Sequence, residues 1–146
     1  MRIEECINRV DSVKPNQYSV DEKVRWLSYL DASIKREIID THEQPMPKED
    51  HTIIVIGDGE IPEEENKEFT GYTPDDMNVE LIAPFPFDEL YVAYLKAKID
   101  EENGDTARYN NSAATFNSLL ADYEKAYNRD HRPITAKIRT YKGVRI

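Results

Sequence analysis

The sequence predicts a mainly α-helical fold, a small antiparallel helical bundle with a loop-rich insertion in its middle. Apolar residues recur at three- and four-residue steps in two long regions, which is the period of an amphipathic helix. Most of the 8 prolines lie between these regions, where they prevent one continuous helix. The length of 146 residues suits a single domain, residues 1–146, built on one core.

The first helical region is predicted to contain a short helix over residues 3–10 and a long helix over residues 20–41. Ser19 and Glu22 form a capping box, in which each side chain satisfies a backbone N–H group at the start of the long helix. One face of the long helix is apolar and contains Val24, Leu27, Leu30 or Asp31, Ile34 and Ile38. Pro15 separates the two helices.

The second helical region is predicted to form helices over residues 88–103 and 105–128. Gly104 either interrupts one helix or ends the first as a C-cap, with Asp105 capping the next. The last helix has the cleanest periodicity in the chain, in steps of four and three residues as in a heptad seam. This seam consists of Tyr109, Ala113, Phe116, Leu120, Tyr123 and Tyr127.

The insertion, residues 43–86, is expected to hold a short β-hairpin. Residues 52–56 are β-branched and precede a Gly-Asp-Gly turn, and residues 79–83 are a second candidate strand. Within the C-terminal tail, residues 129–146, apolar and polar residues alternate from residue 134 to residue 140, as in a strand with one buried face or an extended segment. The apolar positions are Ile134, Ala136 and Ile138. Because so few strands cannot form a stable sheet by themselves, we expect some of these strands to pair with another chain.

The net charge of −10 is distributed unevenly. The insertion contains 12 acidic and 2 basic residues, whereas the tail contains 6 basic and 1 acidic residue. The overall charge opposes non-specific binding to nucleic acid or to anionic lipid, and only the tail could favour either. No apolar run is long enough to cross a bilayer and the N-terminus lacks a secretory signal, so we expect no membrane partner and synthesis in the cytoplasm.

The sequence offers little catalytic chemistry, and we expect neither an enzyme nor a metal or cofactor. His42 beside Glu43 could form a base–carboxylate pair, but a histidine at a helix C-terminus is the favoured interpretation. His51 and His131 are expected at the surface, and Cys6 is expected to be buried and structural. The acidic run at residues 60–68 lacks the spacing of a calcium loop and is interpreted as a solvated loop.

Tyrosine is the conspicuous residue type, with 9 in the chain. A tyrosine-rich face buries its rings while its hydroxyls need hydrogen-bond partners, and such faces are enriched at protein–protein interfaces. Five lie on the two C-terminal helices, namely Tyr91, Tyr94, Tyr109, Tyr123 and Tyr127. They either form an interface or complete the core of the single chain, and the sequence alone leaves both interpretations open.

Two blocks of the chain, residues 7–43 and 84–133, resemble short proteins encoded in the head–tail gene modules of tailed phages and prophages of Gram-positive bacteria. They look like head–tail connector proteins, also called adaptor or head-completion proteins. The most specific pieces are the helix with Trp26-Leu27, the entry at residues 84–94 and the Arg-Tyr-Asn-Asn-Ser run at residues 108–112.

This resemblance implies a virion structural protein, made in the bacterial host cytoplasm, that forms a ring of about twelve copies below the portal. Such a ring binds the portal and the next connector or tail component, and lets DNA pass through its lumen without sequence-specific binding. We expect residues 134–140 to add as a strand to a neighbouring chain. Carboxylates that face the lumen would repel DNA phosphates, and the candidates for this role are Glu63, Glu64 and Glu65. The alternative is that these residues lie on the outside and simply face solvent.

Two alternatives remain at this point. A small acidic inhibitor or regulator that mimics DNA would use the negative insertion to bind a basic enzyme. Another head- or tail-completion protein of the same gene module would share the general pattern but occupy a different place in the virion.

Overall fold

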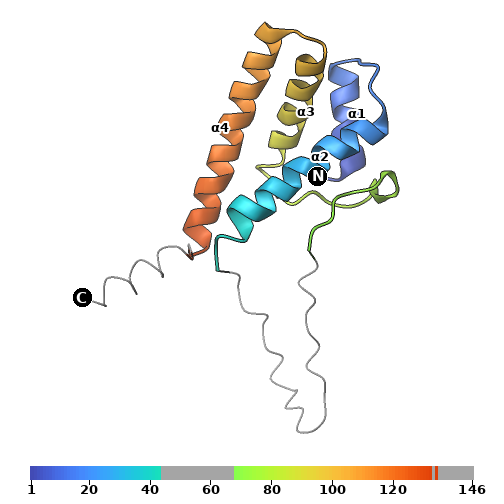
Figure 1. Ribbon diagram of the computed structural model, residues 1–146. Helices are drawn as coiled ribbons and strands as arrows, with labels where there is room; N and C mark the ends of the chain where they lie inside the picture. The colour runs from blue at the N-terminus through green and yellow to red at the C-terminus, as the bar shows by residue number, and fades with distance from the viewer. Residues whose placement is uncertain (44–67, 133, 135–146) are drawn as a thin grey trace, which may run out of the picture.

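The computed structural model describes residues 1–43, 68–132 and 134 (Figure 1). Within these residues the chain is mainly helical, as the sequence predicted. In chain order the elements are α1 (Ile3–Val13), α2 (Val20–Ile34), the π-helical turn η1 (Lys35–Ile39), the 3-10 turn η2 (Pro74–Asp76), α3 (Glu89–Glu102) and α4 (Thr106–Asp130). The hairpin expected at residues 52–59 lies outside the described residues.

The two N-terminal helices start where the sequence places them. α1 continues slightly past its predicted end to Val13 and stops before Pro15, because the residue preceding a proline disfavours the helical conformation. At the start of α2, the backbone N–H of Glu22 donates to the Ser19 hydroxyl at 3.3 Å, which is the Ser19 half of the predicted capping box. The predicted long helix is not regular, because after Ile34 it widens into the π-helical turn η1.

α3 and α4 lie side by side, run in opposite directions and are joined by a tight turn (Figure 1). Gly104 ends α3 with a φ of 74°, in the left-handed region that glycine adopts without strain. The Asp105 carboxylate then accepts a hydrogen bond from the Arg108 N–H at 3.2 Å and caps α4. The C-cap interpretation of Gly104 is therefore confirmed, and the two helices form a hairpin.

The hydrophobic core lies between α1, α2 and α3, with α4 packed mainly against α3. Its largest fully buried apolar side chains come from all three helices and include Ile3, Ile7, Leu27, Ile34, Leu90, Leu95 and Ile99. α3 is thus the central helix of the bundle. Its position determines which surfaces of α2 and α4 are left for other contacts.

Residues 68–83, here called the strap, lie against α2 and lead into α3 (Figure 1). The strand predicted at residues 79–83 is wrong, since the strap makes only one antiparallel β-bridge, between Glu80 and Arg2. Its partner Arg2 is followed directly by α1, whose helical backbone does not extend the ladder. Ile134, the described residue of the predicted C-terminal strand, is not in a strand, and Ala136 and Ile138 lie outside the described residues.

Candidate interaction surfaces

A buried carboxylate joins the strap to two helices. Asp31 of α2 is fully buried and accepts hydrogen bonds from the hydroxyls of Tyr72, at 2.5 Å, and Tyr91, at 2.6 Å. The backbone N–H of Ile82 also donates to Asp31, at 3.3 Å. The N–H of Ala83 donates to the Tyr91 hydroxyl at 2.7 Å. This Asp31 cluster fixes the strap across α2 and α3.

The electrostatics of the Asp31 cluster follow from its burial. Desolvation raises the pKa of Asp31, and the three hydrogen bonds it accepts oppose that shift without cancelling it. Burial and the adjacent Asp31 carboxylate raise the pKa values of Tyr72 and Tyr91, so both hydroxyls stay protonated and act as donors at neutral pH. This cluster was not predicted from the sequence. A signal for it was present in the sequence, because Asp31 is a carboxylate that falls on the apolar face of α2.

Two of the five predicted interface tyrosines lie in the core of the single chain. Tyr91 is 0 % exposed and Tyr123 is 5 % exposed. The Tyr123 ring lies 5.6 Å from that of Phe87, centroid to centroid, and burial raises the pKa of its hydroxyl to about 12. The core interpretation therefore accounts for Tyr91 and Tyr123, and the interface interpretation remains for the partly exposed Tyr94, Tyr109 and Tyr127.

The α3–α4 hairpin has two different sides, each hollowed by a shallow groove. The groove on one side, the aromatic flank, has a volume of about 230 Å³ and is lined in part by Tyr94, Tyr109 and Phe116. The rings of Tyr94 and Phe116 pack at 5.1 Å. The groove on the other side, the non-aromatic flank, has a volume of about 260 Å³ and is lined in part by Val92, Ala93, Ser112, Thr115 and Leu119.

The ends of α2 and α4 meet at a histidine and tyrosine cluster. The buried His42 imidazole contacts the backbone carbonyl of Ile38 and the side chain of Asn128. The same imidazole and the Tyr127 ring pack edge to face at 5.0 Å between centroids, and His131 stacks on the Tyr127 ring at 4.0 Å. His42 thus joins two helix ends, in agreement with the helix-terminus interpretation.

The remaining candidates for chemistry are structural or lie outside the described residues. Cys6 is fully buried, and burial raises the pKa of its thiol to about 12, so it is not a thiolate nucleophile. In the described ranges, no group of three His, Cys, Asp or Glu side chains could hold a metal ion. None of the described helices is long and apolar enough to cross a membrane. Glu63, Glu64, Glu65 and His51 lie outside these ranges.

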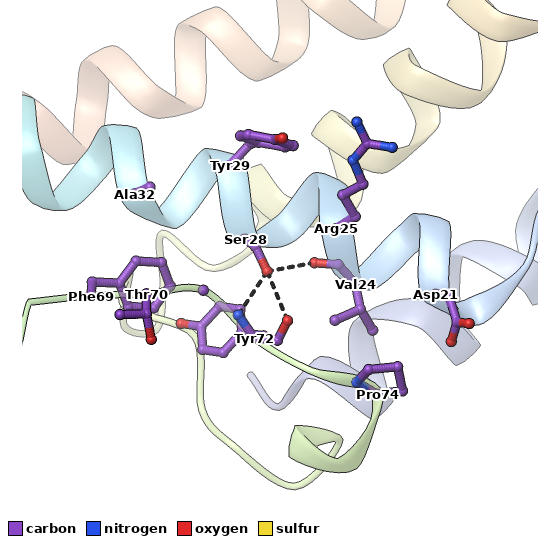
Figure 2. A pocket seen from close by; sticks show the side chains of 11 residues that line it. Asp21, Val24, Arg25, Ser28, Tyr29, Ala32, Phe69, Thr70, Tyr72 and Pro74 are labelled. Atoms are coloured by element: carbon purple, nitrogen blue, oxygen red, sulfur yellow. Dashed lines mark hydrogen bonds between the residues drawn. The ribbon is translucent and has the colours of Figure 1, made fainter.

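A third groove, which the sequence did not predict, lies between α2 and the strap (Figure 2). This strap groove has a volume of about 510 Å³. The Tyr72 N–H donates to the Ser28 hydroxyl at 2.8 Å, and that hydroxyl donates to the Val24 carbonyl at 2.9 Å. A Cβ atom on Gly71 would lie 3.5 Å from the Cβ of Ser28, so the strap backbone approaches α2 closely there.

No protein-family model, curated protein or solved structure matches the chain. A proposal about its function therefore depends on the sequence resemblance and on the surfaces just described. These surfaces include the strap groove beside α2 and the grooves on the two sides of the α3–α4 hairpin.

Proposed function

We propose that this chain is a virion structural protein, a head–tail connector that forms a ring below the portal and joins the capsid to the tail. The main supporting observation is that the aromatic and non-aromatic flanks of the α3–α4 hairpin differ chemically. A closed ring uses a head-to-tail interface, in which one surface of each copy meets a different surface of the next. A helical hairpin with two unlike sides has the form that such an interface needs.

The distribution of the resemblance also supports this proposal. Residues 7–43 contain most of α1 and all of α2, and residues 84–133 contain α3 and α4. The two blocks that resemble connector proteins are therefore the two that build the helical bundle. The proposed lumen role of Glu63, Glu64 and Glu65 stays a prediction, and unchanged DNA retention and ejection after their neutralisation would contradict it.

The direct test is imaging of the full-length protein, alone and mixed with the portal and the proteins encoded by neighbouring genes. We expect closed rings or collars in negative-stain micrographs, with the copy number given by native mass spectrometry. A chain that stays single in the presence of the portal would contradict the proposal. A salt-sensitive complex with a basic DNA-binding enzyme, without rings, would instead support the DNA-mimic alternative.

A charge placed on the aromatic flank should prevent ring formation. We expect Tyr109→Glu to abolish rings while leaving the helical circular dichroism unchanged, because Tyr109 lines the groove and is only partly buried. Ala114→Glu is the matched control, since it adds the same charge to the same helix at an exposed position outside the two grooves. Equal loss of rings in both variants would show that the flank itself is not the interface.

Removal of the basic tail tests the second proposed contact between copies. Deletion of residues 133–146 should abolish assembly, because the tail can then no longer add as a strand to a neighbouring copy. Circular dichroism should still show the helices, since the described bundle ends at α4. Rings that form without the tail would contradict its role.

A further inference from the structure

We infer that the strap groove is the docking site for the basic C-terminal segment, residues 135–146, of a neighbouring copy. This inference rests on the proposed function, because it requires copies of the chain to lie side by side. It identifies the surface that receives the tail, which the sequence could not do. Three properties of the groove support it, namely an unpaired backbone edge, an apolar floor and an acidic border.

The backbone edge belongs to the part of the strap that lines the groove. Within the described ranges, no hydrogen bond involves the backbone N–H or C=O groups of Phe69, Thr70 or Gly71. These residues are not helical, so their polar groups are available to an incoming chain. An extended peptide can pair with the main-chain groups of Phe69 and Thr70 while its alternate side chains enter the groove, and the φ of 100° at Gly71 ends this stretch.

The floor of the groove suits the apolar side chains of such a peptide. Val24 and Ala32 of α2 line one side, and the rings of Phe69 and Tyr72 pack edge to face on the other at 5.0 Å between centroids (Figure 2). Tyr29 borders the same space and is 60 % exposed, although it is a large aromatic residue. Exposed tyrosine beside an apolar depression is typical of a binding surface.

The border of the groove is acidic. The strap contains 4 acidic residues and no basic residue; these are Glu68, Asp75, Asp76 and Glu80. Glu68 and Asp75 are exposed and adjoin the lining residues Phe69 and Pro74, and Asp21 lines the groove from α2. Arg25 also lines the groove, with its guanidinium 5.7 Å from the centroid of the Tyr29 ring. Carboxylates thus outnumber cations along this border.

The C-terminal segment has the complementary chemistry. Residues 135–146 contain 4 basic and no acidic residues, and the basic positions are Lys137, Arg139, Lys142 and Arg145. Apolar residues stand among them, namely Ile138, Tyr141, Val144 and Ile146. A segment of this length spans at most about 40 Å when extended, so it can reach a groove on an adjacent copy. The basic C-terminal segment is opposite in charge to the acidic border of the groove, which favours it as the occupant over the acidic insertion.

The tail leaves the bundle at a defined point. The Ile134 N–H donates to the Thr41 carbonyl at 2.9 Å, and the Glu43 N–H donates to the Arg132 carbonyl at 2.8 Å. The tail therefore starts beyond the C-terminal end of α2, while the strap groove borders the helix from Asp21 to Ala32. Reach alone also permits a tail to fold back on its own chain, and the experiment must separate the two cases.

The first experiment measures binding of a labelled peptide of residues 135–146 by fluorescence anisotropy. The receptor is the full-length protein whose four tail cations are changed to glutamate, so its own tail does not compete. We expect binding that weakens as salt rises, and a loss of affinity of roughly tenfold or more when Glu68→Lys and Asp75→Lys are added. The matched control is Glu37→Lys with Glu124→Lys, two exposed positions away from the groove.

The control pair makes the same change in net charge and should alter the affinity by less than about twofold. No peptide binding, or equal weakening by both pairs, would overturn the inference. Tyr29→Ala should also weaken binding, because it removes an exposed ring beside the floor without removing a buried group. Circular dichroism of each variant verifies that the helices are retained.

The second experiment decides which copy supplies the tail. Full-length Thr70→Cys, Thr140→Cys protein is treated with a short bismaleimide, alone and with the portal; the native Cys6 is buried and does not compete. A ladder of linked chains supports docking between copies. An internally linked single chain, or no linkage, overturns it. Thr140→Cys with Ala114→Cys is the control pair, because residue 114 lies outside the groove.

The two proposals fail in distinguishable ways. If the peptide binds the strap groove but no ring forms with the portal, the proposed connector function is wrong. If rings form normally in the Glu68→Lys, Asp75→Lys variant and the peptide does not bind, the groove assignment is wrong and the connector proposal stands.

Discussion

α3 and α4 are neighbouring helices with tyrosines at helical spacing, yet they have opposite roles in the structure. α3 buries eight of its 14 residues, whereas α4 buries only Tyr123 among its 25. α3 is enclosed by three other helices, and α4 contacts the bundle along one edge. The clean period of α4 in the sequence therefore shows which side faces a neighbour, and it does not show how deeply that side is buried.

The largest expected effect is a matched pair of leucine truncations in the two helices. Leu95→Ala in α3 should lower the free energy of unfolding by about 2–5 kcal/mol, because the side chain is fully buried and its loss leaves a cavity. Leu120→Ala in α4 should cost less than half as much, since Leu120 is only partly buried. Urea unfolding of both variants gives the two values, and equal losses would contradict the contrast between the helices.

A smaller effect is expected from removal of one hydroxyl in α3. Tyr91→Phe should destabilise the fold by about 2–3 kcal/mol, because Asp31 loses a donor and the buried Ala83 N–H loses its acceptor. Tyr94→Phe is the control in the same helix, since Tyr94 lies on the aromatic flank. It should change stability by less than about 0.5 kcal/mol. Similar thermal shifts in the two variants would show that the Asp31 cluster adds no stability.

The smallest expected effect is the pH dependence that Asp31 contributes. Its folded-state pKa is raised above the ordinary value of 3.8, so the folded protein binds this proton more readily than the unfolded chain. The resulting stability is fully present below the unfolded pKa and is lost as pH rises through the folded pKa.

Asp31→Asn removes this titration and serves as the reference. The unfolding free energy of the native protein, minus that of Asp31→Asn, should therefore increase as pH is lowered from about 7 toward about 4. Urea unfolding at several pH values measures this difference. A difference that stays constant, or falls on acidification, would contradict the raised pKa.

Much of the secondary structure was predictable because its signals are local. The Ser19 cap, the stop before Pro15 and the glycine turn at Gly104 each depend on residues within one helical turn. The predicted strand at residues 79–83 failed for a non-local reason, since a strand needs a partner strand and, within the described ranges, this segment pairs only through the Glu80–Arg2 bridge.

The candidate surfaces were predictable only in part. Tyrosine spacing identified Tyr94 and Tyr109, which line the aromatic flank, but it also selected Tyr91 and Tyr123, which are buried. The strap groove was not predicted, because its sides come from α2 and from residues more than forty positions away, as the Ser28–Tyr72 hydrogen bond shows. No local pattern indicates that such segments meet.

The sequence by itself determined the helical class, the approximate starts of the helices and the separation of negative and positive charge along the chain. These properties follow from backbone sterics, capping and residue type, which act over a few neighbouring positions. Only the tertiary structure decided which tyrosines are buried, that Asp31 binds the strap, and that a groove lies beside it. Those outcomes depend on packing between segments distant in the chain.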